Sequence, residues 1–281
     1  MKSSYLLPLS LLATACARNP YAATNHVYRQ QAKQLARQLR AQPAVPADSL
    51  PTMPYWVGTV NFNLRKPNYV IIHHTAQHST EQTLKTFTLV KTQVSAHYVI
   101  GRDGQTYHLL NDYLRAWHGG AARWGSATDI NSVSIGIELD NDGAEPFQEA
   151  QISSLLRVLA SLKRTYNIPA ANFIGHGDIA PTRKNDPSAL FPWQRLAAHG
   201  YGLWYDATVL ADTTAAPFAT DSTGRLASLT PQEALRIIGY DTQDLPAAIA
   251  AFKRHFVQTD VRPVLTDIDR RILYALYRKY L

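Results

Sequence analysis

The stretch Tyr69-Val-Ile-Ile72-His73-His74-Thr75 indicates the kind of fold that this chain adopts. Four apolar residues in succession are typical of a central strand that helices cover on both faces, because alternate side chains of a strand point to opposite sides. Outward from this stretch, between Tyr55 and about Tyr205, strand-like and helix-like patterns alternate, which indicates an α/β domain. We therefore expect a central sheet flanked by helices, with a pair of histidines where one buried strand ends.

Two other patterns within this region have clear local signals. Arg102-Asp-Gly-Gln105 is a turn sequence between the strand-like segments 97–100 and 106–110, and it predicts a hairpin. A helix is predicted where apolar residues recur at helical spacing, and these residues are Ile152, Leu155, Leu156, Leu159 and Leu162.

The last fifty residues predict a separate module of three helices, over 229–281. Thr230-Pro231-Gln-Glu233 combines a capping residue, a proline at the first helical position and a capping-box glutamate, and Gly239 is placed to end that helix. A second helix is predicted from about Pro246 to Phe256, and Thr266 opens a third. So small a bundle has a thin core, so we expect it to use the larger domain as a packing partner. Residues 211–228 lack this order and are predicted to be a linker.

The start of the chain is typical of an exported protein. Met1-Lys2 precedes a mostly apolar segment, and residues 13–16 read Ala-Thr-Ala-Cys, which predicts a signal peptide over 1–15 and a lipid-modified Cys16. The alternative is an ordinary signal peptide that is cleaved near Cys16. No other segment approaches the roughly 20 apolar residues that a spanning helix needs. We therefore expect a lipid anchor, followed by a tether over 16–54 and a catalytic domain over 55–210.

The charge balance narrows the choice of partners. The chain has a formal charge of +7, and removal of residues 1–15 takes away one lysine and leaves +6. A basic exported protein rarely meets nucleic acid, so we expect none as a partner and favour envelope polymers that carry carboxylates. The tether contains a short basic helix with Arg29, Lys33, Arg37 and Arg40, which either lies on anionic headgroups or is a solvated spacer.

The loop His176-Gly-Asp-Ile-Ala-Pro-Thr-Arg-Lys184-Asn-Asp186-Pro concentrates an imidazole, an amine and a carboxylate between glycine and proline. Loops of this composition usually carry chemistry. Two neutral imidazoles, one carboxylate and a water form a tetrahedral zinc site that is open for catalysis, and His73, His176 and Asp186 supply this set. For a single histidine the ordinary alternative is a structural role, His73 at the end of a strand and His176 in a turn.

Two more groups could serve such a site. In Ser132-Val-Ser-Ile-Gly-Ile-Glu138, the Glu138 carboxylate lies on the strand face that carries the small residues Ser134 and Gly136, where it could accept a proton from water. The alternative for Glu138 is a charged strand end at the surface. The ammonium of Lys184 could stabilise the oxyanion that forms when a hydroxide adds to an amide carbonyl, although exposed lysines are common.

Together these residues resemble a known family, the type-2 zinc-dependent N-acetylmuramoyl-L-alanine amidases, which are related to T7 lysozyme and to peptidoglycan recognition proteins. The resemblance covers about residues 55–205. It is carried by Val-Ile-Ile-His73-His-Thr-Ala, Ser-Ala-His97-Tyr, Ala-Trp117-His118-Gly-Gly, Ile130-Asn-Ser-Val-Ser-Ile-Gly-Ile-Glu138 and Gly-His176-Gly-Asp-Ile-Ala-Pro-Thr-Arg-Lys184-Asn-Asp186-Pro. Gly119 departs from the alanine that is more common in the family, which puts little in doubt.

This resemblance implies a mixed β-sheet flanked by helices and a single zinc ion on His73, His176 and Asp186. It makes Glu138 the catalytic carboxylate and gives Lys184 the transition-state role. His74 points to the opposite strand face and is expected to be structural. Expected substrate contacts are His97, Trp117, His118, Trp124 and Arg183, although aromatic residues near a core are often simply core.

The lipoprotein start and the helical tail resemble the AmiD-like outer-membrane members of the family. The segments 234–240 and 251–256 are similar to the peptidoglycan-binding domain found there, with a packing module as the alternative. Ala17 after the cysteine suggests sorting to the outer membrane, facing the periplasm.

The expected function is hydrolysis of the amide bond between N-acetylmuramic acid and L-alanine in peptidoglycan or muropeptides. The competing classes are a non-catalytic peptidoglycan receptor and an envelope interaction protein that acts through its tail and tether.

Overall fold

The computed structural model describes residues 19–41, 59, 61, 63–211, 218 and 229–281. The chain divides into two compact units, Met1–Phe62 and Asn63–Leu281. In the first unit the predicted basic helix is present as α1 (Ala22–Arg40), with Arg37 and Arg40 in its last turn and no buried residue. The predicted signal peptide and Cys16 lie outside the described residues, as does nearly all of the predicted linker.

A five-stranded mixed sheet is the centre of the second unit, as predicted. The strands are β1 (Tyr69–His74), β2 (Tyr98–Ile100), β3 (Thr106–His108), β4 (Ser134–Leu139) and β5 (Phe173–Gly175), in the order β3-β2-β4-β1-β5. β1 is parallel to both β4 and β5, β2 is parallel to β4, and β3 is antiparallel to β2. The predicted hairpin of β2 and β3 is therefore confirmed, and β1 is a central strand.

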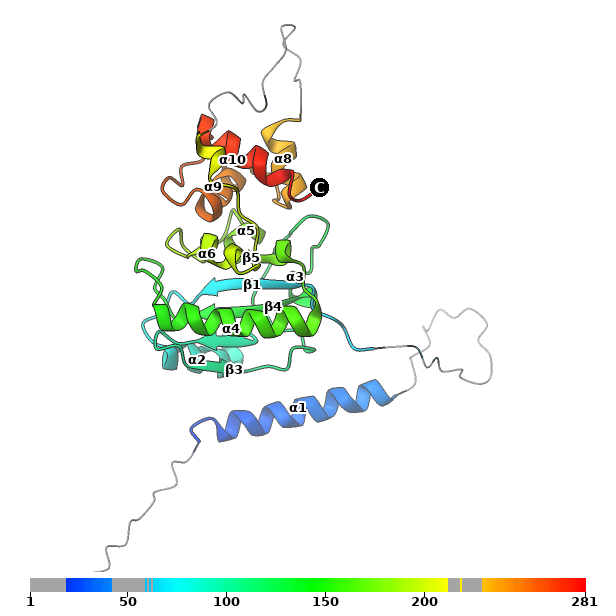
Figure 1. The fold of residues 1–281 in the computed structure, drawn as a ribbon. Helices are drawn as coiled ribbons and strands as arrows, with labels where there is room; N and C mark the ends of the chain where they lie inside the picture. Colours follow the sequence, from blue (N-terminus) through cyan, green and yellow to red (C-terminus); the bar gives the residue numbers. More distant parts are fainter. Residues whose placement is uncertain (1–18, 42–58, 60, 62, 212–217, 219–228) are drawn as a thin grey trace, which may run out of the picture. The chain divides into compact units, whose positions relative to one another are not determined.

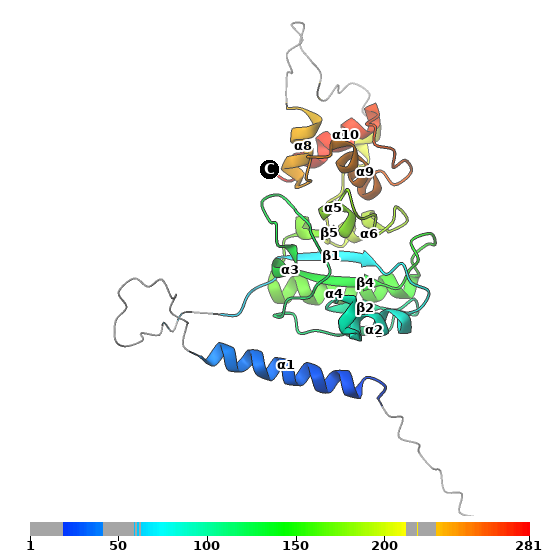
Figure 2. The same ribbon diagram turned by 180° about the vertical axis from the view of Figure 1, so that it is seen from behind.

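Both faces of β1 are buried, which explains its continuous apolar run. Val70 and Ile72 pack in one cluster with Leu155 and Leu159 of α4 (Glu149–Tyr166), whose apolar stripe confirms the predicted helix. Ile71 points the other way, into a second cluster that includes residues of the C-terminal helices. Figure 1 shows α4 across the sheet, and both Figures 1 and 2 show the C-terminal helices beyond β5.

Short helices connect the strands. Of these, α2 begins with a capping bond from the Gln82 amide to the Ser79 hydroxyl, which satisfies one of its free N–H groups. α5 begins directly after β5, so the last residue of the strand, Gly175, is also the N-cap of this helix. The short helices between strands are α2 (Thr80–Thr88), η1 (Val90–Thr92), α3 (Ile130–Val133) and η2 (Ala170–Asn172), and those after the last strand are α5 (His176–Ile179), α6 (Trp193–Ala198) and α7 (Thr208–Ala211).

The C-terminal module contains the three predicted helices, α8 (Pro231–Ile238), α9 (Leu245–Phe256) and α10 (Asp267–Tyr277). The capping box of Thr230 and Glu233 is present, and Gly239 ends α8 with a positive φ of 132°. Thr266 and Asp269 form a second capping box at α10.

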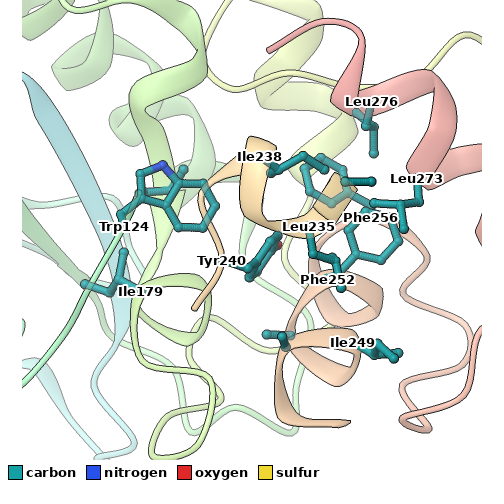
Figure 3. Packing of buried hydrophobic residues seen from close by; sticks show 14 of the residues in the cluster. Trp124, Ile179, Leu235, Ile238, Tyr240, Ile249, Phe252, Phe256, Leu273 and Leu276 are labelled. Carbon is teal, nitrogen blue, oxygen red and sulfur yellow. The ribbon is translucent and has the colours of Figure 1, made fainter. Parts of the chain in front are cut away.

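The core of this module is continuous with the larger domain. Trp124 and Ile179 of the α/β domain share one cluster with Leu235 and Phe252 of the module. Figure 3 shows Tyr240 between Trp124 and Phe252, and its ring lies edge-on to that of Trp124 at a centroid distance of 4.9 Å. The expected dependence of the small bundle on the larger domain is thus visible as a shared apolar core.

None of the helices in the described part of the chain has both the length and the apolar character needed to cross a membrane.

Gly239 joins the two parts of this core closely. A Cβ atom at this position would lie 2.4 Å from the Trp124 ring, and φ is unfavourable for other residues. We expect Gly239→Ala to lower the free energy of unfolding by about 2–4 kcal/mol, from backbone strain and overpacking together. Urea denaturation measures the change.

Gly125→Ala is the matched control. Its φ is also positive, but a Cβ there meets no atom within 4 Å, so only the backbone cost of about 1 kcal/mol should appear. Equal losses in the two variants would contradict close packing at Gly239.

Candidate metal centre and active site

Three parallel strands bring the candidate residues to one edge of the sheet. His73 lies near the end of β1, directly opposite Glu138 of β4 in the strand register. His176 is the first residue of α5, immediately after β5. Because these strands are parallel, their carboxyl ends meet at the same edge, which is where sites form in α/β sheets.

The atoms of the predicted ligand set face one another. His73 Nδ1 lies 2.9 Å from His176 Nδ1 and 3.1 Å from Asp186 Oδ2, and His176 Nδ1 lies 3.0 Å from Asp186 Oδ2. All three side chains are buried. Among the described residues, this is the group of histidine and acidic side chains that could hold a metal ion.

The second ring nitrogen of His176 shows which nitrogen carries its proton. His176 Nε2 lies 3.2 Å from the carbonyl oxygen of Gly119, which can only accept a hydrogen bond. The neutral imidazole therefore carries its proton on Nε2 and leaves a lone pair on Nδ1. Such a bond also holds the orientation of a ligand ring.

The same deduction applies to His73 through a chain of three side chains. The Ser134 hydroxyl donates to the Ile130 carbonyl at 2.6 Å, so Ser134 Oγ accepts from His118 Nε2 at 3.1 Å. His118 Nδ1 is then an acceptor and lies 3.0 Å from His73 Nε2, which must donate. His73 therefore also presents a lone pair on Nδ1.

Three lone-pair atoms within about 3 Å of each other fit a cation. Ligands of tetrahedral zinc with bonds of about 2.0–2.1 Å lie about 3.3–3.4 Å apart, close to the observed separations. Burial lowers the pKa of His73 to about 4, with a smaller contribution from the adjacent His176 ring, so the His73 ring is neutral at physiological pH. The donor set, its protonation and its spacing all suit zinc.

Glu138 lies beside this cluster with an unusual environment. Its Oε2 atom is buried and has no hydrogen-bond partner among the described residues. Burial, helped by the charge of Asp186, raises the pKa of Glu138 to about 8, and the positive charge of Lys184 opposes this shift. A carboxyl group whose pKa is near neutrality is suited to proton transfer.

The residues of the 180–186 loop differ in their roles. Lys184 is half-buried, and its positive charge lowers the pKa of both Glu138 and His73. The ammonium group therefore acts electrostatically on the ligand cluster. Arg183 instead donates to the carbonyls of Gly119 and Ala121 at 2.8 and 2.7 Å. Its guanidinium therefore holds the chain segment whose carbonyl orients His176.

The other predicted substrate contacts are dispersed. Trp117 is 49% exposed, whereas Trp124 is 5% exposed and packs in the shared core beside Tyr240.

His97 is fully buried, with Nδ1 accepting from the Gly136 amide and Nε2 donating to the Leu114 carbonyl. His118 contacts the cluster through His73 but is itself buried.

His74 lies outside the ligand triangle. It accepts a hydrogen bond from the Ser188 amide and packs on Gly143, in agreement with its expected structural role.

Some residues around the site are not among those predicted from the sequence. Ser134 sets the tautomer of His118, and Asn131 Oδ1 accepts from the amides of His118 and Gly119 at 3.1 and 2.8 Å. Asp178, two residues after His176, is buried and hydrogen-bonded. Their one sequence signal is their position inside or next to the motifs that contain the ligands.

Comparison with known proteins agrees with this site. The family described as N-acetylmuramoyl-L-alanine amidase matches residues 63–189. N-acetylmuramoyl-L-alanine amidase AmiD of Escherichia coli (strain K12) is 34% identical over 235 residues, which are 75% of this chain and 82% of that protein. The 1,6-anhydro-N-acetylmuramyl-L-alanine amidase AmpD of the same organism is 40% identical over 104 residues, 37% of this chain and 57% of that protein.

Solved structures agree as well. The complex of AmiD from E. coli with anhydro-N-acetylmuramic acid-L-Ala-D-gamma-Glu-L-Lys is similar with a TM-score of 0.67 and 30% identity, covering 79% of this chain and 93% of that chain. AmpDh3 from Pseudomonas aeruginosa has a TM-score of 0.66 and 25% identity, covering 82% and 99%. The matched segment contains the sheet, the ligand triangle and Glu138, and the likeness to AmiD extends over most of both chains. This chain therefore belongs to the N-acetylmuramoyl-L-alanine amidase family.

Proposed function

We propose that this protein uses one zinc ion to hydrolyse the amide bond between the lactyl group of N-acetylmuramic acid and L-alanine, in peptidoglycan or muropeptides. The 1,6-anhydro form of the sugar is included, because the similar protein AmpD is named for that substrate and the similar AmiD structure is a complex with an anhydro-N-acetylmuramic acid peptide. One observation carries the proposal: three atoms with lone pairs suited to a metal converge beside the Glu138 carboxyl group, whose Oε2 has no hydrogen-bond partner among the described residues. A receptor that only binds muropeptides has no need of this combination.

The ligands in this proposal are His73 Nδ1, His176 Nδ1 and Asp186. When bound, zinc supplies a Lewis acid and a water that is acidic enough to act as a nucleophile near neutral pH. Within the chain, His118 and the Gly119 carbonyl keep both imidazoles in the tautomer that presents Nδ1. These bonds favour a positioning role for His118, rather than direct contact with substrate.

Glu138 is the proton carrier of the proposed reaction. As a carboxylate it takes a proton from the attacking water while oxygen bonds to the lactyl carbonyl carbon. As an acid it returns that proton to the alanine nitrogen when the C–N bond breaks, so that the products are a carboxylic acid and an amine. Its raised pKa suits both directions of transfer.

The remaining predicted site residues have three proposed roles: charge stabilisation, substrate contact and support of the site. The ammonium of Lys184 stabilises the oxygen that becomes negative during attack. Trp117 is the exposed aromatic residue among the predicted substrate contacts, and it offers an apolar face to sugar or peptide. Arg183, His97 and Trp124 support the site by packing and hydrogen bonds.

The proposed location is the bacterial envelope. A lipid on Cys16 would hold the protein at the outer membrane, facing the periplasm, where its peptidoglycan substrate lies. This part of the proposal depends on the sequence alone. Labelling of cells with a fatty-acid analogue, compared between wild type and Cys16→Ser, tests it directly.

Product analysis tests the activity. Protein without residues 1–16 is incubated with muropeptides, with and without a zinc chelator, and the products are resolved by mass spectrometry. We expect release of free stem peptide, loss of release with chelator, and recovery when zinc is added. Muropeptide that is retained but intact would instead indicate a receptor.

Glu138→Gln tests the proton carrier. The amide keeps the shape of the side chain but cannot accept the proton, so we expect kcat to fall by about 10²–10⁴-fold. Zinc content, measured by atomic emission, should remain one ion per chain. Full turnover in this variant would remove Glu138 from the mechanism.

The raised pKa of Glu138 also predicts a pH effect on the metal-free protein. The folded chain keeps a proton up to a pKa of about 8, whereas the unfolded chain releases it near 4.5. Stability should therefore fall as pH rises through this interval, by up to about 1.4 kcal/mol per pH unit. Other titratable groups, the histidines included, are common to the wild type and to a Glu138→Gln variant, so the difference between their two slopes is assigned to Glu138.

Urea denaturation with chelator present, between pH 6.5 and 8, measures this slope. Glu138→Gln is the control and should lack it. Parallel profiles for the two proteins would mean that the carboxyl group titrates normally.

A further inference from the structure

Asp178 connects the ligand loop to the C-terminal module. It lies two residues after His176 in the four-residue helix α5 and is 3% exposed. Its carboxylate accepts three hydrogen bonds, from the Gly175 amide, the Tyr240 hydroxyl and His255 Nδ1, each at 2.7 Å. The first bond caps α5, and the other two come from the helical module.

The two donors from the module are themselves held rigidly. The ring of His255, in α9, stacks on Trp193 at a centroid distance of 3.8 Å and on Phe256 at 4.0 Å. Tyr240 is packed edge-on against Trp124. These ring contacts hold the two donors, and their hydrogen bonds in turn hold the Asp178 carboxylate.

Other contacts of α9 and the residues after it reach the same stretch of chain. Gln258 donates to the carbonyls of Ala189 and Phe191 at 2.8 and 2.6 Å. Arg254 Nη1 approaches Gly177 closely, since a Cβ there would lie 3.2 Å from it. The module thus contacts the segment 175–191, which contains both His176 and Asp186.

Inside that segment, one bond ties the two ligands together. The Gly177 amide donates to the Asp186 carbonyl at 2.6 Å, so the backbone beside His176 is bonded directly to the backbone of Asp186. A cavity of about 10 Å³ separates this bond from α9 and is bordered by Asp186, Arg254 and His255. Its volume is that of a single water, so the packing around the ligand loop is otherwise close.

A helix of four residues cannot hold its own shape. Helix formation has a costly first turn, and short helices depend on tertiary contacts. A buried carboxylate is stable only when its oxygens accept hydrogen bonds. Loss of the donor from Tyr240 or His255 would therefore favour a shift of the Asp178 side chain toward another donor or water. Such a shift would move His176, two residues away, out of the ligand triangle.

We propose that Tyr240 and His255, acting on Asp178, position the His176–Asp186 loop for metal binding. We call these three residues the Asp178 clasp. The C-terminal module is then part of the metal centre, in addition to any contact that it makes with peptidoglycan. The inference rests on the proposed function in one respect, that zinc is the ion that this loop binds.

The test compares zinc affinity in the full-length protein and two clasp variants, Tyr240→Phe and His255→Phe. Each keeps an aromatic ring and removes one donor to Asp178. We expect zinc affinity to fall about tenfold in each, as it does when partners of metal ligands are lost. Competition with a chromophoric chelator measures this affinity, at a temperature where circular dichroism shows every variant folded.

Two controls separate positioning from stability. Tyr274→Phe makes the same chemical change on α10, away from the ligand loop, and should leave zinc affinity unchanged. Ile272→Val thins the shared core, because Ile272 is buried there, and should lower the melting temperature without weakening zinc.

The outcomes are distinct. Unchanged zinc affinity in both folded clasp variants would overturn the clasp and leave the proposed function intact. Equal weakening in Ile272→Val would show that affinity only follows stability, which also overturns the clasp. If the wild type binds zinc but cleaves no muropeptide, the proposed activity fails, whereas tenfold weaker binding in the clasp variants still supports the clasp. A wild type that binds no zinc overturns both.

Discussion

The convergence of three lone pairs at one edge of the sheet is the constraint on which the rest of this structure depends. His73 Nδ1, His176 Nδ1 and Asp186 Oδ2 lie about 3 Å apart in a buried space, and in the tautomers that the neighbouring acceptors select, neither Nδ1 carries the ring proton. Without a cation such an arrangement is repulsive, so the surrounding structure must hold it together. Each neighbour of the triangle performs part of that task, the Gly119 carbonyl for His176 and the His118–Ser134 pair for His73.

The two apolar clusters support the triangle from different sides. α4 packs on the face of Val70 and Ile72, and this contact holds the strands that carry His73 and Glu138 next to their last residues. The cluster around Ile71 and Ile179 continues into the C-terminal helices, which reach the loop of His176 and Asp186. The ligand from β1 and the two ligands from the loop thus depend on different parts of the core, and the module has a structural reason to be attached to the domain.

Much of this architecture could be predicted from local patterns. The apolar run of β1 required two covered faces, the turn at 102–105 required a hairpin, and Thr230 with Glu233 marked the start of α8. The ligand set followed from residue chemistry and from resemblance to a family, since no spacing joins His73 to a loop more than a hundred residues later. Aromatic and basic side chains are harder to interpret from the sequence, because their roles depend on their surroundings. Trp124 and Arg183 are residue types that often contact substrate. In the structure Trp124 packs in the shared core, and Arg183 donates to backbone carbonyls.

The sequence by itself determined the elements of this protein and the identity of its reactive groups, because strand alternation, helix caps and donor chemistry are properties of neighbouring residues. Only the tertiary structure decided which nitrogen of each histidine faces the metal position, because the proton of each ring is set by acceptors from distant segments. It also decided the surroundings of Glu138, whose pKa depends on burial and on the charges of Asp186 and Lys184. The link from Asp178 to Tyr240 and His255 belongs to the same class. Tyr240 lies 62 positions after Asp178 in the sequence, and His255 lies 77 positions after it. No local pattern could predict that both side chains bind the same carboxylate.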